Sequence, residues 1–459
     1  FNHMHIFLDP QPDVEVAYQE RLRLFKAAQG WASYDPGKLG PGGGIFSRKA
    51  KSIPLSPEVK AMLGVLKDEL PVDVVLRLLL RLNVDLLWNG GIGTYVKASH
   101  QTHRDAGDPT NDDVRVNATE LRCRIVGEGG NLGFTQAGRI EYALGGGRIN
   151  TDAIDNSGGV DMSDHEVNLK ILLNPMVARG SLGSAERNDL LEALTDEVAE
   201  DVLANNDRHG RQLSLDVIRS ARDPMFFSRT IDWVCQRSGV TRAALVLPTD
   251  DTLQRRKANN QGLTRPELAV LQAYVKMHVF KDLKQADPSL VPGFDDKVLG
   301  YFPARVRAAY PEDIGKHMLH RSIGMTVVCG EIIGESGALF FPLLNELTGR
   351  PVEVIARAWY QAMELVGAEG LRKAIRKSDA GVEARYRAWV GVTDAVQGLV
   401  GAWLAAGEPG PDAEDHGAIK DALARVGKAR GSELEARLRS RADAHVERGI
   451  PQRLAERTR

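Results

Sequence analysis

The stretch INTDAIDNSGGVDMSDHE, residues 149–166, gathers hydrogen-bonding side chains around a Gly-Gly corner. The amide of Asn156 offers both a donor and an acceptor, which matches a ligand carboxamide such as that of nicotinamide. Gly158 and Gly159 leave space beside that amide. Ser163 lies one or two turns into the next expected helix and can face the same cleft. The stretch is therefore a candidate for binding a carboxamide together with a second polar group.

A purely structural explanation of this stretch is also open. Asn156 or Ser157 suits the N-cap of a helix, and Asp161 and Asp164 would interact favourably with the dipole of that helix. Capping and ligand binding can occur in the same corner, so one does not exclude the other.

A second Gly-rich corner, NGGIGTYVK, follows the strand-like run VDLLW. It begins with Asn89, Gly90 and Gly91, and its glycines let the backbone approach a ligand closely. It is not a Walker loop, because no Gly-Lys-Ser/Thr sequence follows. A glycine-rich turn without a ligand is the alternative.

A third corner lies in IVGEGGNLGFTQAGR, residues 125–139. Its Asn131 can both donate and accept hydrogen bonds where a nucleotide ribose could lie. Thr135 is a candidate cap for a helix that would run to about residue 144. Asparagine is common in loops, so this motif alone is weak.

An acidic residue, Asp9, ends the strand-like run HIFLD. In a dinucleotide-binding fold such an acid accepts hydrogen bonds from the adenine ribose and favours NAD over its 2′-phosphorylated form. Because Pro10 follows, a helix cap or a turn is the alternative. The segment GGGIFSRKAKSIPLS, residues 42–56, is basic and includes Arg48; we expect a solvated loop in preference to a clamp for an anion.

The histidines do not predict a metal site. His100 and His103 lie in a polar loop, and His317 and His320 lie in a helical context. Neither pair has a third ligand nearby, and no HExxH motif is present. A GxSxG nucleophile motif is also missing from the sequence.

The elements that must position these corners alternate over the first 170 residues. Helices are expected at 15–28 and 56–70, among strand-like runs at 5–9, 84–88, 122–130 and 148–154. Strands separated by helix-length segments predict a parallel sheet with helices on its faces. Because parallel strands end at one edge of their sheet, the corners would meet there, where open α/β sheets bind ligands.

From about residue 171 onward the pattern is helical. In the segment 264–284, Thr264 and Glu267 fit a capping box. Apolar residues recur along one face of that segment, at Leu268, Leu271, Val275, Val279 and Leu283. Further helices are expected at 351–367 and around 383–390, a loop at 407–416, and a solvated, charged helix at 432–459. Two domains are therefore expected, residues 1–170 and 171–459.

Composition limits the class of protein. The 459 residues suffice for two or three domains, and a formal net charge of −2 gives no reason to expect nucleic acid or an anionic membrane as a partner. Three widely spaced cysteines argue against a disulfide scaffold and indicate a reducing cytoplasm. The most apolar run, 72–88, is charged and shorter than the roughly 20 apolar residues of a membrane span.

The start of the chain predicts a fragment. No signal peptide is recognisable, and the sequence begins with Phe1 and enters a strand-like run at once. We expect that a longer protein contains this chain.

Together the three corners resemble the coenzyme domain of amino-acid dehydrogenases of the glutamate, leucine and phenylalanine group. That group carries Pro-Ala-Ala, then Glu-Gly-Ala-Asn, then Asn-Ala-Gly-Gly-Val followed by Ser and an acid. The corresponding segments here are, in the same order, Asn89–Gly91, Glu128–Asn131, and Asn156–Val160 with Ser163 and Glu166. Longer blocks, such as VDLLWNGGIGTYVKAS and VGEGGNLGFTQAGRIEYALGGGRINTDAIDNSGG, are similar to the large bacterial NAD-specific glutamate dehydrogenases.

The resemblance covers most of the chain and is dense from residue 42 to 170. It implies an α/β, Rossmann-like coenzyme domain over residues 1–170, incomplete at its N-terminus, followed by a mostly α-helical C-terminal domain. It further implies that NAD is bound by Asp9 at the adenine ribose, by Asn89, Gly90, Gly91 and Asn131 along the nicotinamide ribose, and by Asn156 at the carboxamide. Substrate glutamate would meet Val160 and Ser163, with the Ser163 hydroxyl at the side-chain carboxylate.

Some positions depart from the pattern of the smaller enzymes, which have Ala where Gly90, Gly91, Gly130 and Ser157 stand here. The first strand and its phosphate-binding turn, and the substrate domain, are expected before Phe1. In the family that domain supplies a carbonyl-polarising lysine and a proton-shuttling aspartate. We therefore assign no catalytic residue to this chain.

The resemblance implies reversible oxidative deamination of L-glutamate by NAD to 2-oxoglutarate and ammonium, in a cytoplasmic homo-oligomer. This chain would supply the coenzyme-binding side and the hinge. One alternative is a dehydrogenase for another amino acid, such as leucine, with an apolar substrate pocket. The other is a non-catalytic helical module for assembly or regulation, which would not bind NAD.

Overall fold

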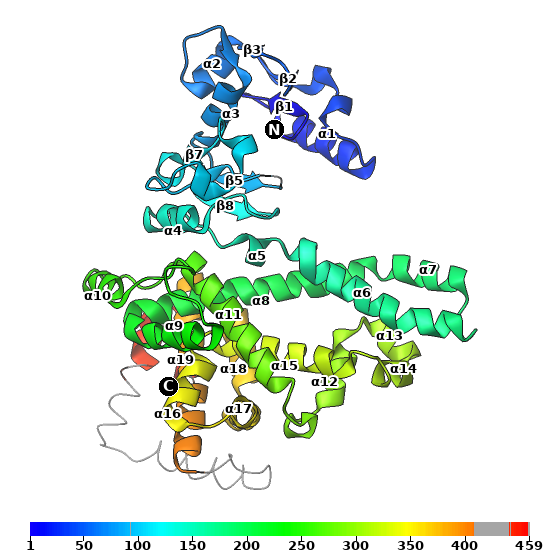
Figure 1. Ribbon diagram of the computed structural model, residues 1–459, viewed down its shortest axis with the longest axis vertical. Helices are drawn as coiled ribbons and strands as arrows, with labels where there is room; N and C mark the ends of the chain where they lie inside the picture. Colours follow the sequence, from blue (N-terminus) through cyan, green and yellow to red (C-terminus); the bar gives the residue numbers. More distant parts are fainter. Residues whose placement is uncertain (92, 408–439, 441, 458–459) are drawn as a thin grey trace. The chain divides into compact units, whose positions relative to one another are not determined.

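The computed structural model describes residues 1–91, 93–407, 440 and 442–457. The chain divides into two compact units, Phe1–Asp152 and Ala153–Arg459. Figure 1 traces the elements of each unit along the sequence. The structure is mostly helical, and the described strands all belong to the first unit.

The strands of the first unit pair two by two. Two pairs are antiparallel: β1 (His5–Leu8) with β2 (Gly44–Ser47), and β3 (Ser52–Pro54) with β4 (Glu69–Pro71). Two pairs are parallel: β5 (Leu86–Asn89) with β8 (Ile125–Glu128), and β6 (Val96–Lys97) with β7 (Val116–Asn117). Parallel pairing of the strands that precede two of the corners agrees with the prediction, whereas the antiparallel partner of β1 does not. That partner, β2, lies in the segment interpreted as a basic loop.

The helices of the first unit are short. They are α1 (Val14–Lys26), α2 (Pro57–Leu63), α3 (Val72–Leu80) and α4 (Gln136–Leu144), and α5 (Asp152–Asp155) crosses the boundary between the units. Single 3₁₀ turns occur at Trp31–Ser33, Pro36–Lys38, Arg104–Ala106, Pro109–Asn111 and Ala118–Glu120.

Two predicted elements of this unit are wrong in extent. The helix expected over 56–70 ends at Leu63, because Gly64 adopts a left-handed conformation with φ of 69° that closes the helix. The strand expected over 148–154 is reduced to one bridge, between Ile125 and Arg148, and the chain turns into α5 at Asp152. By contrast, Thr135 caps α4 as predicted, since its side chain accepts a hydrogen bond from Gly138 N–H.

A compact apolar core fixes the strands of the first unit. Alternating residues of β1, Ile6 and Leu8, are buried, as are Val75 and Leu76 on one face of α3. These residues share a cluster with Val96, Val126 and Phe134 from the later strands and the loop after β8. This cluster therefore fixes the position of the parallel pair within the first unit.

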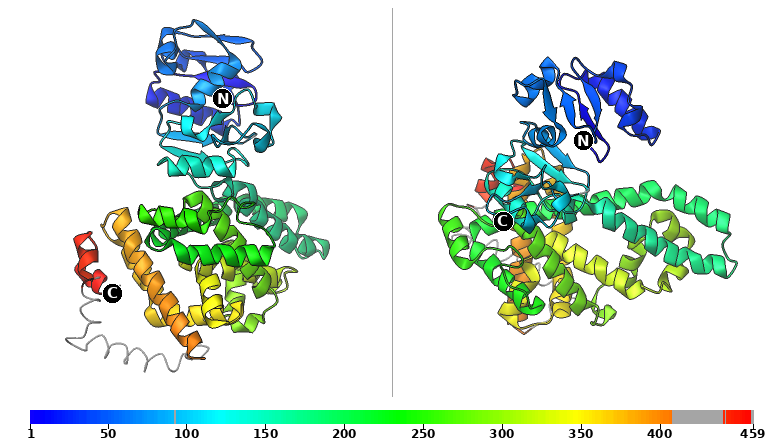
Figure 2. Two further views of the ribbon diagram at one scale, coloured as in Figure 1. Left: turned by 60° about the vertical axis from the view of Figure 1, so that its left-hand side comes forward. Right: turned by 45° about the horizontal axis from the view of Figure 1, so that its top comes forward.

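The described part of the second unit is built of α-helices, a single 3₁₀ turn at Pro288–Leu290, and loops. The helices are α6 (Ser157–Ala178), α7 (Ser184–Ala193), α8 (Thr195–Arg222), α9 (Pro224–Ser238), α10 (Asp250–Ala258), α11 (Arg265–Leu283), α12 (Phe294–Tyr301), α13 (Ala304–Ala309), α14 (Pro311–Gly315), α15 (His320–Ser336), α16 (Phe340–Thr348), α17 (Val352–Val366), α18 (Ala368–Lys377), α19 (Val382–Ala405) and α22 (Gln452–Arg457). Figure 2 shows the long helix α19, in orange, beside the yellow helices α16 and α17 that it contacts.

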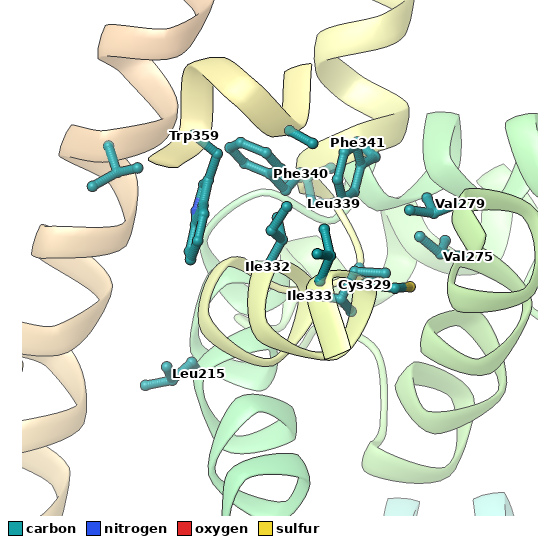
Figure 3. Packing of buried hydrophobic residues seen from close by; sticks show 14 of the residues in the cluster. Leu215, Val275, Val279, Cys329, Ile332, Ile333, Leu339, Phe340, Phe341 and Trp359 are labelled. Carbon is teal, nitrogen blue, oxygen red and sulfur yellow. The ribbon is translucent and has the colours of Figure 1, made fainter. Parts of the chain in front are cut away.

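Helix α11 confirms the sequence prediction closely. It begins with the capping box of Thr264 and Glu267, and its five predicted apolar residues are fully buried. They join a core in which α15, α16 and α17 also meet. Figure 3 shows Ile332, Phe340 and Trp359 packed together there, and Trp359 Nε1 donates a hydrogen bond to Ser336 Oγ at 2.7 Å.

The end of the chain is less solvated than predicted. Most of the loop expected at 407–416, and residues 432–439, 441, 458 and 459 of the expected terminal helix, lie outside the described residues. Within the described part of that tail, Ile450, Leu454 and Ala455 are buried in the core of the second unit. The described part of the tail is therefore packed against the second unit, and the expected continuous helix is interrupted before α22, since residues 448–451 are not helical.

Among the described residues, no single helix is long and apolar enough to cross a membrane. Helices α15 and α16 meet such a criterion only when they are taken together, by length and composition, and they are bent by 91° at the break between them.

Candidate functional site

Two of the three predicted corners lie side by side in the first unit. The register of the parallel pair places Asn89, the last residue of β5, opposite Glu128, the last residue of β8. The segments 89–91 and 128–131 therefore leave the sheet at the same edge. This is the arrangement that the spacing of glycine-rich corners and strands predicts.

The backbones of these two corners approach each other more closely than side chains would allow. A Cβ atom on Gly130 would lie 2.1 Å from Gly91 Cα, and Gly91 itself has φ of 137°. Gly130 N–H donates to the carbonyl of Asn89 at 3.2 Å, and Gly91 N–H donates to Asn89 Oδ1 at the same distance. Glycine at positions 91 and 130 is thus a condition for joining the corners.

A buried ion pair holds the second corner. Arg139, from α4, donates to both carboxylate oxygens of Glu128 at 2.7 and 2.9 Å, and it lies 3.2 Å from Asp152. Burial lowers the pKa of the Arg139 guanidinium, but these carboxylates outweigh burial and raise it, so the arginine stays charged. Asp152 also accepts from Leu132 N–H at 2.8 Å. The loop is therefore held by hydrogen bonds on both sides of the exposed Asn131, at Glu128 and at Leu132.

A pocket of about 500 Å³ opens beside the first corner. Asn89, Gly90 and Gly91 line it, together with Tyr95 and Arg48. From the basic segment 42–56, Arg48 reaches this pocket, which the prediction of a solvated loop did not anticipate. The polarity of the corner and the positive charge of Arg48 suit an anionic or amide-bearing ligand.

Asp9 is tied into its own loop. Its Oδ1 accepts from Gly40 N–H at 3.0 Å, which is the turn-stabilising role named above as the alternative. Its Oδ2 is buried and has no hydrogen-bond partner among the described residues. A buried carboxylate oxygen without a partner is costly, so this atom is suited to a ligand donor that reaches it.

The third corner belongs to the second unit. Asn156 is the N-cap residue of α6 by backbone geometry, but its side chain makes no capping hydrogen bond. A Cβ atom on Gly159 would lie 2.7 Å from Asn156 Nδ2, so the Gly-Gly sequence clears space for this amide. Ser163 Oγ donates to the carbonyl of Val160 at 2.8 Å, and Val160 is exposed.

Residues of the second unit that the sequence did not single out hold this corner in place. Asn206, from α8, donates to the carbonyl of Ile154 at 2.7 Å and to Ser157 Oγ at 2.8 Å. His165, about two turns further along α6, stacks on Tyr301 of α12 with ring centroids 4.4 Å apart. No local pattern could reveal these contacts, because each joins segments at least 49 residues apart in sequence.

The described residues contain no group of three or more His, Cys, Asp or Glu side chains that could hold a metal ion. Apart from the Glu128 carboxylate, which is paired with Arg139, the polar groups assigned to the ligand in the three corners are amides, a hydroxyl and backbone N–H groups. Such groups bind and orient an organic ligand, and none of them is placed to act as a nucleophile or a general base.

Comparison with known proteins finds matching family models over nearly the whole chain. The family model described as "Bacterial NAD-glutamate dehydrogenase, catalytic domain" matches residues 1–216, and "Glutamate dehydrogenase, C-terminal" matches residues 260–459. Three similar curated relatives bear the name NAD-specific glutamate dehydrogenase. The relative from Pseudomonas aeruginosa is 44% identical over 78% of this chain and 22% of its own length, and that from Halomonas elongata is 42% identical over 79% and 23%.

The third relative, from Mycobacterium tuberculosis, is 36% identical over 100% of this chain and 29% of its own length. The chain thus spans about a quarter of the length of the curated relatives it matches. With both family models matched in order and relatives of one name along its entire length, the chain belongs to the bacterial NAD-glutamate dehydrogenase family.

Proposed function

We propose that this chain is the coenzyme-binding and C-terminal part of an NAD-dependent glutamate dehydrogenase. The reaction is L-glutamate, NAD⁺ and water giving 2-oxoglutarate, ammonium, NADH and a proton. The observation that carries the proposal is the contact between the Asn89–Gly91 and Glu128–Asn131 corners at the carboxyl ends of a parallel strand pair. That edge is where open α/β sheets bind nucleotides, and the names of the relatives agree with the coenzyme and the substrate.

The residues present fit NAD. The unpartnered Oδ2 of Asp9 is suited to a ribose hydroxyl, and the first corner with its adjoining pocket gives close backbone approach to the nicotinamide ribose. Asn131 would bind along the same ribose. Asn156 has donor and acceptor groups that complement the carboxamide, with Gly158 open beside it.

When bound, NAD accepts the hydride that leaves the α-carbon of glutamate. The residues of this chain position the reactants for that transfer: the amide of Asn156 orients the nicotinamide carboxamide, and Ser163 directs the substrate carboxylate beside Val160. No described residue of this chain is assigned the proton transfers of imine formation and hydrolysis. Those transfers belong to the lysine and aspartate that the family resemblance places outside the chain.

Several finer assignments belong to the same proposal. Residues 1–170 form a Rossmann-like NAD-binding domain and residues 171–459 a helical C-terminal domain, with the hinge near α6. The three cysteines of the chain are free, which suits a reducing cytoplasm. We also infer a homo-oligomeric enzyme, from the resemblance alone.

The test uses the full-length protein and measures NADH formation at 340 nm with NAD, in parallel with glutamate and with leucine. We expect turnover with glutamate in large excess over leucine, and saturable NAD binding by fluorescence titration. Turnover with leucine instead would establish the other dehydrogenase class. A full-length protein that neither binds NAD nor oxidises either amino acid would support the assembly or regulatory module. The 459-residue chain alone is expected to give no glutamate-dependent NADH.

A further inference from the structure

A pocket of about 770 Å³ lies within the helical unit, away from the corners described above. Its walls come from α6, α8, α11, α12 and α15. Lys276 of α11 and Arg208 and His209 of α8 line it. The resemblance assigns no role to any of these three residues.

Lys276 and His209 form a close pair in this pocket. Lys276 Nζ lies 2.6 Å from His209 Nε2, which requires the imidazole to be neutral and to accept the lysine proton. Burial, and then the charges of Lys276 and Arg208, lower the pKa of His209 to about 3. Burial likewise lowers the pKa of Lys276. Lys276 is thus a buried ammonium hydrogen-bonded to a neutral imidazole. That hydrogen bond compensates only part of the free-energy cost of removing the charge from water.

A second cation is directed to the same place. The aliphatic part of Arg208 crosses Gly334 on α15, where a Cβ atom would lie 2.6 Å from Arg208 Cδ. Glycine at this position lets the arginine lie flat against α15. Among the described residues, no carboxylate lies within ion-pair distance of the side-chain nitrogens of Lys276 or Arg208.

Groups that could neutralise these cations are engaged elsewhere or are uncharged. Cys329, which Figure 3 shows on α15, donates to the carbonyl of Lys276, and burial raises the pKa of its thiol to about 12, so it carries no charge at neutral pH. Glu331 accepts from Lys297 and from Tyr360, each at 2.7 Å. Asp161 accepts from Asn205 at 3.1 Å.

The remaining acids of the pocket, Asp201 and Asp296, are exposed to solvent. They weaken the attraction for a polyanion more than for a single small anion, because a large anion would extend toward them. Among the described residues the pocket therefore combines two cations without an ion-pair partner, Arg208 on α8 and Lys276 on α11, with negative charge from Asp161, Asp201 and Asp296.

We propose that Lys276, Arg208 and His209 form a binding site for the oxyanion group, phosphate or carboxylate, of a small molecule. An oxyanion placed between Lys276 and Arg208 forms charge-assisted hydrogen bonds and compensates the desolvation of both cations. The neutral His209 keeps the Lys276 ammonium at this position through the hydrogen bond at its Nε2. The volume of the pocket accommodates a molecule larger than the anion itself.

Isothermal titration calorimetry on the 459-residue chain at pH 7.5 and low ionic strength tests this site, with inorganic phosphate and succinate as probes. Sodium chloride at matched ionic strength serves as the control for nonspecific screening. Binding of one equivalent of phosphate or of succinate is expected, and comparison of the two shows which oxyanion the site prefers.

Three variants make the test specific. Lys276→Met should weaken the binding of the preferred probe by about tenfold or more, through loss of one charge-assisted hydrogen bond. Lys276→Arg, which keeps the charge, should retain most of it. Lys281→Met removes an exposed lysine from the same helix outside the pocket, and it should bind like the wild type.

Equal affinities of Lys276→Met and Lys281→Met would overturn the proposal, as would absence of binding by the folded wild-type chain. If Lys276→Met fails to fold, as judged by circular dichroism, Arg208→Met replaces it with the same expectation. None of these readouts depends on NAD or glutamate. Failure of the oxyanion site can therefore be distinguished from failure of the proposed dehydrogenase function.

Discussion

Gly130 and Gly91 touch backbone to backbone: a Cβ atom on Gly130 would lie 2.1 Å from Gly91 Cα. This contact joins two loops that are 39 residues apart in sequence and makes a single polar edge of them. The contact is possible because neither glycine has a side chain. Adding one methyl group to Gly130 should therefore separate the loops.

Gly130→Ala is therefore expected to destabilise the first unit by about 1–3 kcal/mol, the usual cost of forcing an extra group into a packed site. The same substitution should weaken NAD binding by the full-length enzyme. Gly90→Ala is the matched control, because its nearest neighbour would be Trp88 at an ordinary 3.7 Å. Urea unfolding of both variants checks the stability difference, and equal free energies of unfolding would contradict the close-contact argument. NAD titration compares Gly130→Ala with the unmodified full-length enzyme.

The buried pair of Glu128 and Arg139 should be intolerant of the loss of one partner. Arg139→Met leaves the Glu128 carboxylate buried without its main donor, and we expect a loss of about 3–5 kcal/mol in the free energy of unfolding. The double variant Glu128→Gln with Arg139→Met should recover part of this loss. Arg77→Met removes a half-buried partner of Asp73 in a single i,i+4 pair and should cost less than about 1 kcal/mol. A double variant as unstable as Arg139→Met would show that the charge itself is not the cause.

Asp9→Asn separates the two roles of this carboxylate. The amide keeps an oxygen that can accept from Gly40 N–H, but it removes the negative charge offered to a ribose. In the full-length enzyme we expect a higher KM for NAD and weaker discrimination against NADP. Asp13→Asn, at the N-cap of α1, removes the same charge nearby and should leave both unchanged. Unaltered coenzyme kinetics in Asp9→Asn would leave only the loop-stabilising role.

Asn156→Ala and Ser163→Ala should separate coenzyme and substrate effects in the full-length enzyme. Asn156→Ala is expected to raise the KM for NAD, because the amide partner of the carboxamide is removed. Ser163→Ala should chiefly raise the KM for glutamate. Steady-state kinetics with each substrate varied in turn provide the measurement. The reverse pattern would mean that the two roles are exchanged.

The carboxylate of Glu20 should make the first unit sensitive to acid. Hydrogen bonds from Arg23 and from Asp35 N–H lower the pKa of Glu20 to about 2, from an ordinary value near 4.5. Because the folded-state pKa is the lower one, this stabilisation is complete above about pH 4.5 and is lost as the pH falls toward 2.

Glu20→Gln should therefore be less stable than wild type at pH 6 and approach it at low pH. Urea unfolding across that range measures the difference. Glu15→Gln, on the exposed face of the same helix, is the control and should differ little from wild type throughout. A Glu20→Gln defect that does not change with pH would contradict the ionic origin.

The sequence by itself determined the features that depend on neighbours along the chain. The cap at Thr135, the capping box at Thr264 and the buried face of α11 follow from side chains within one or a few turns. The strands β1, β5 and β8 were located by short apolar runs, and the glycine-rich corners by the Gly and Asn residues in the sequence. These signals are strong because their hydrogen bonds and periodicity are local.

Only the tertiary structure decided which distant segments meet. It gave β1 an antiparallel partner in β2, ended α2 at Gly64, buried Ile450 in a charged tail, and placed Lys276 against His209. Each of these outcomes depends on burial or on pairing between segments, and their free energy is gained only when the chain closes on itself. Composition and periodicity indicate which helix faces and strands must be buried or paired. Which distant segment covers each of them is decided by packing in the folded chain.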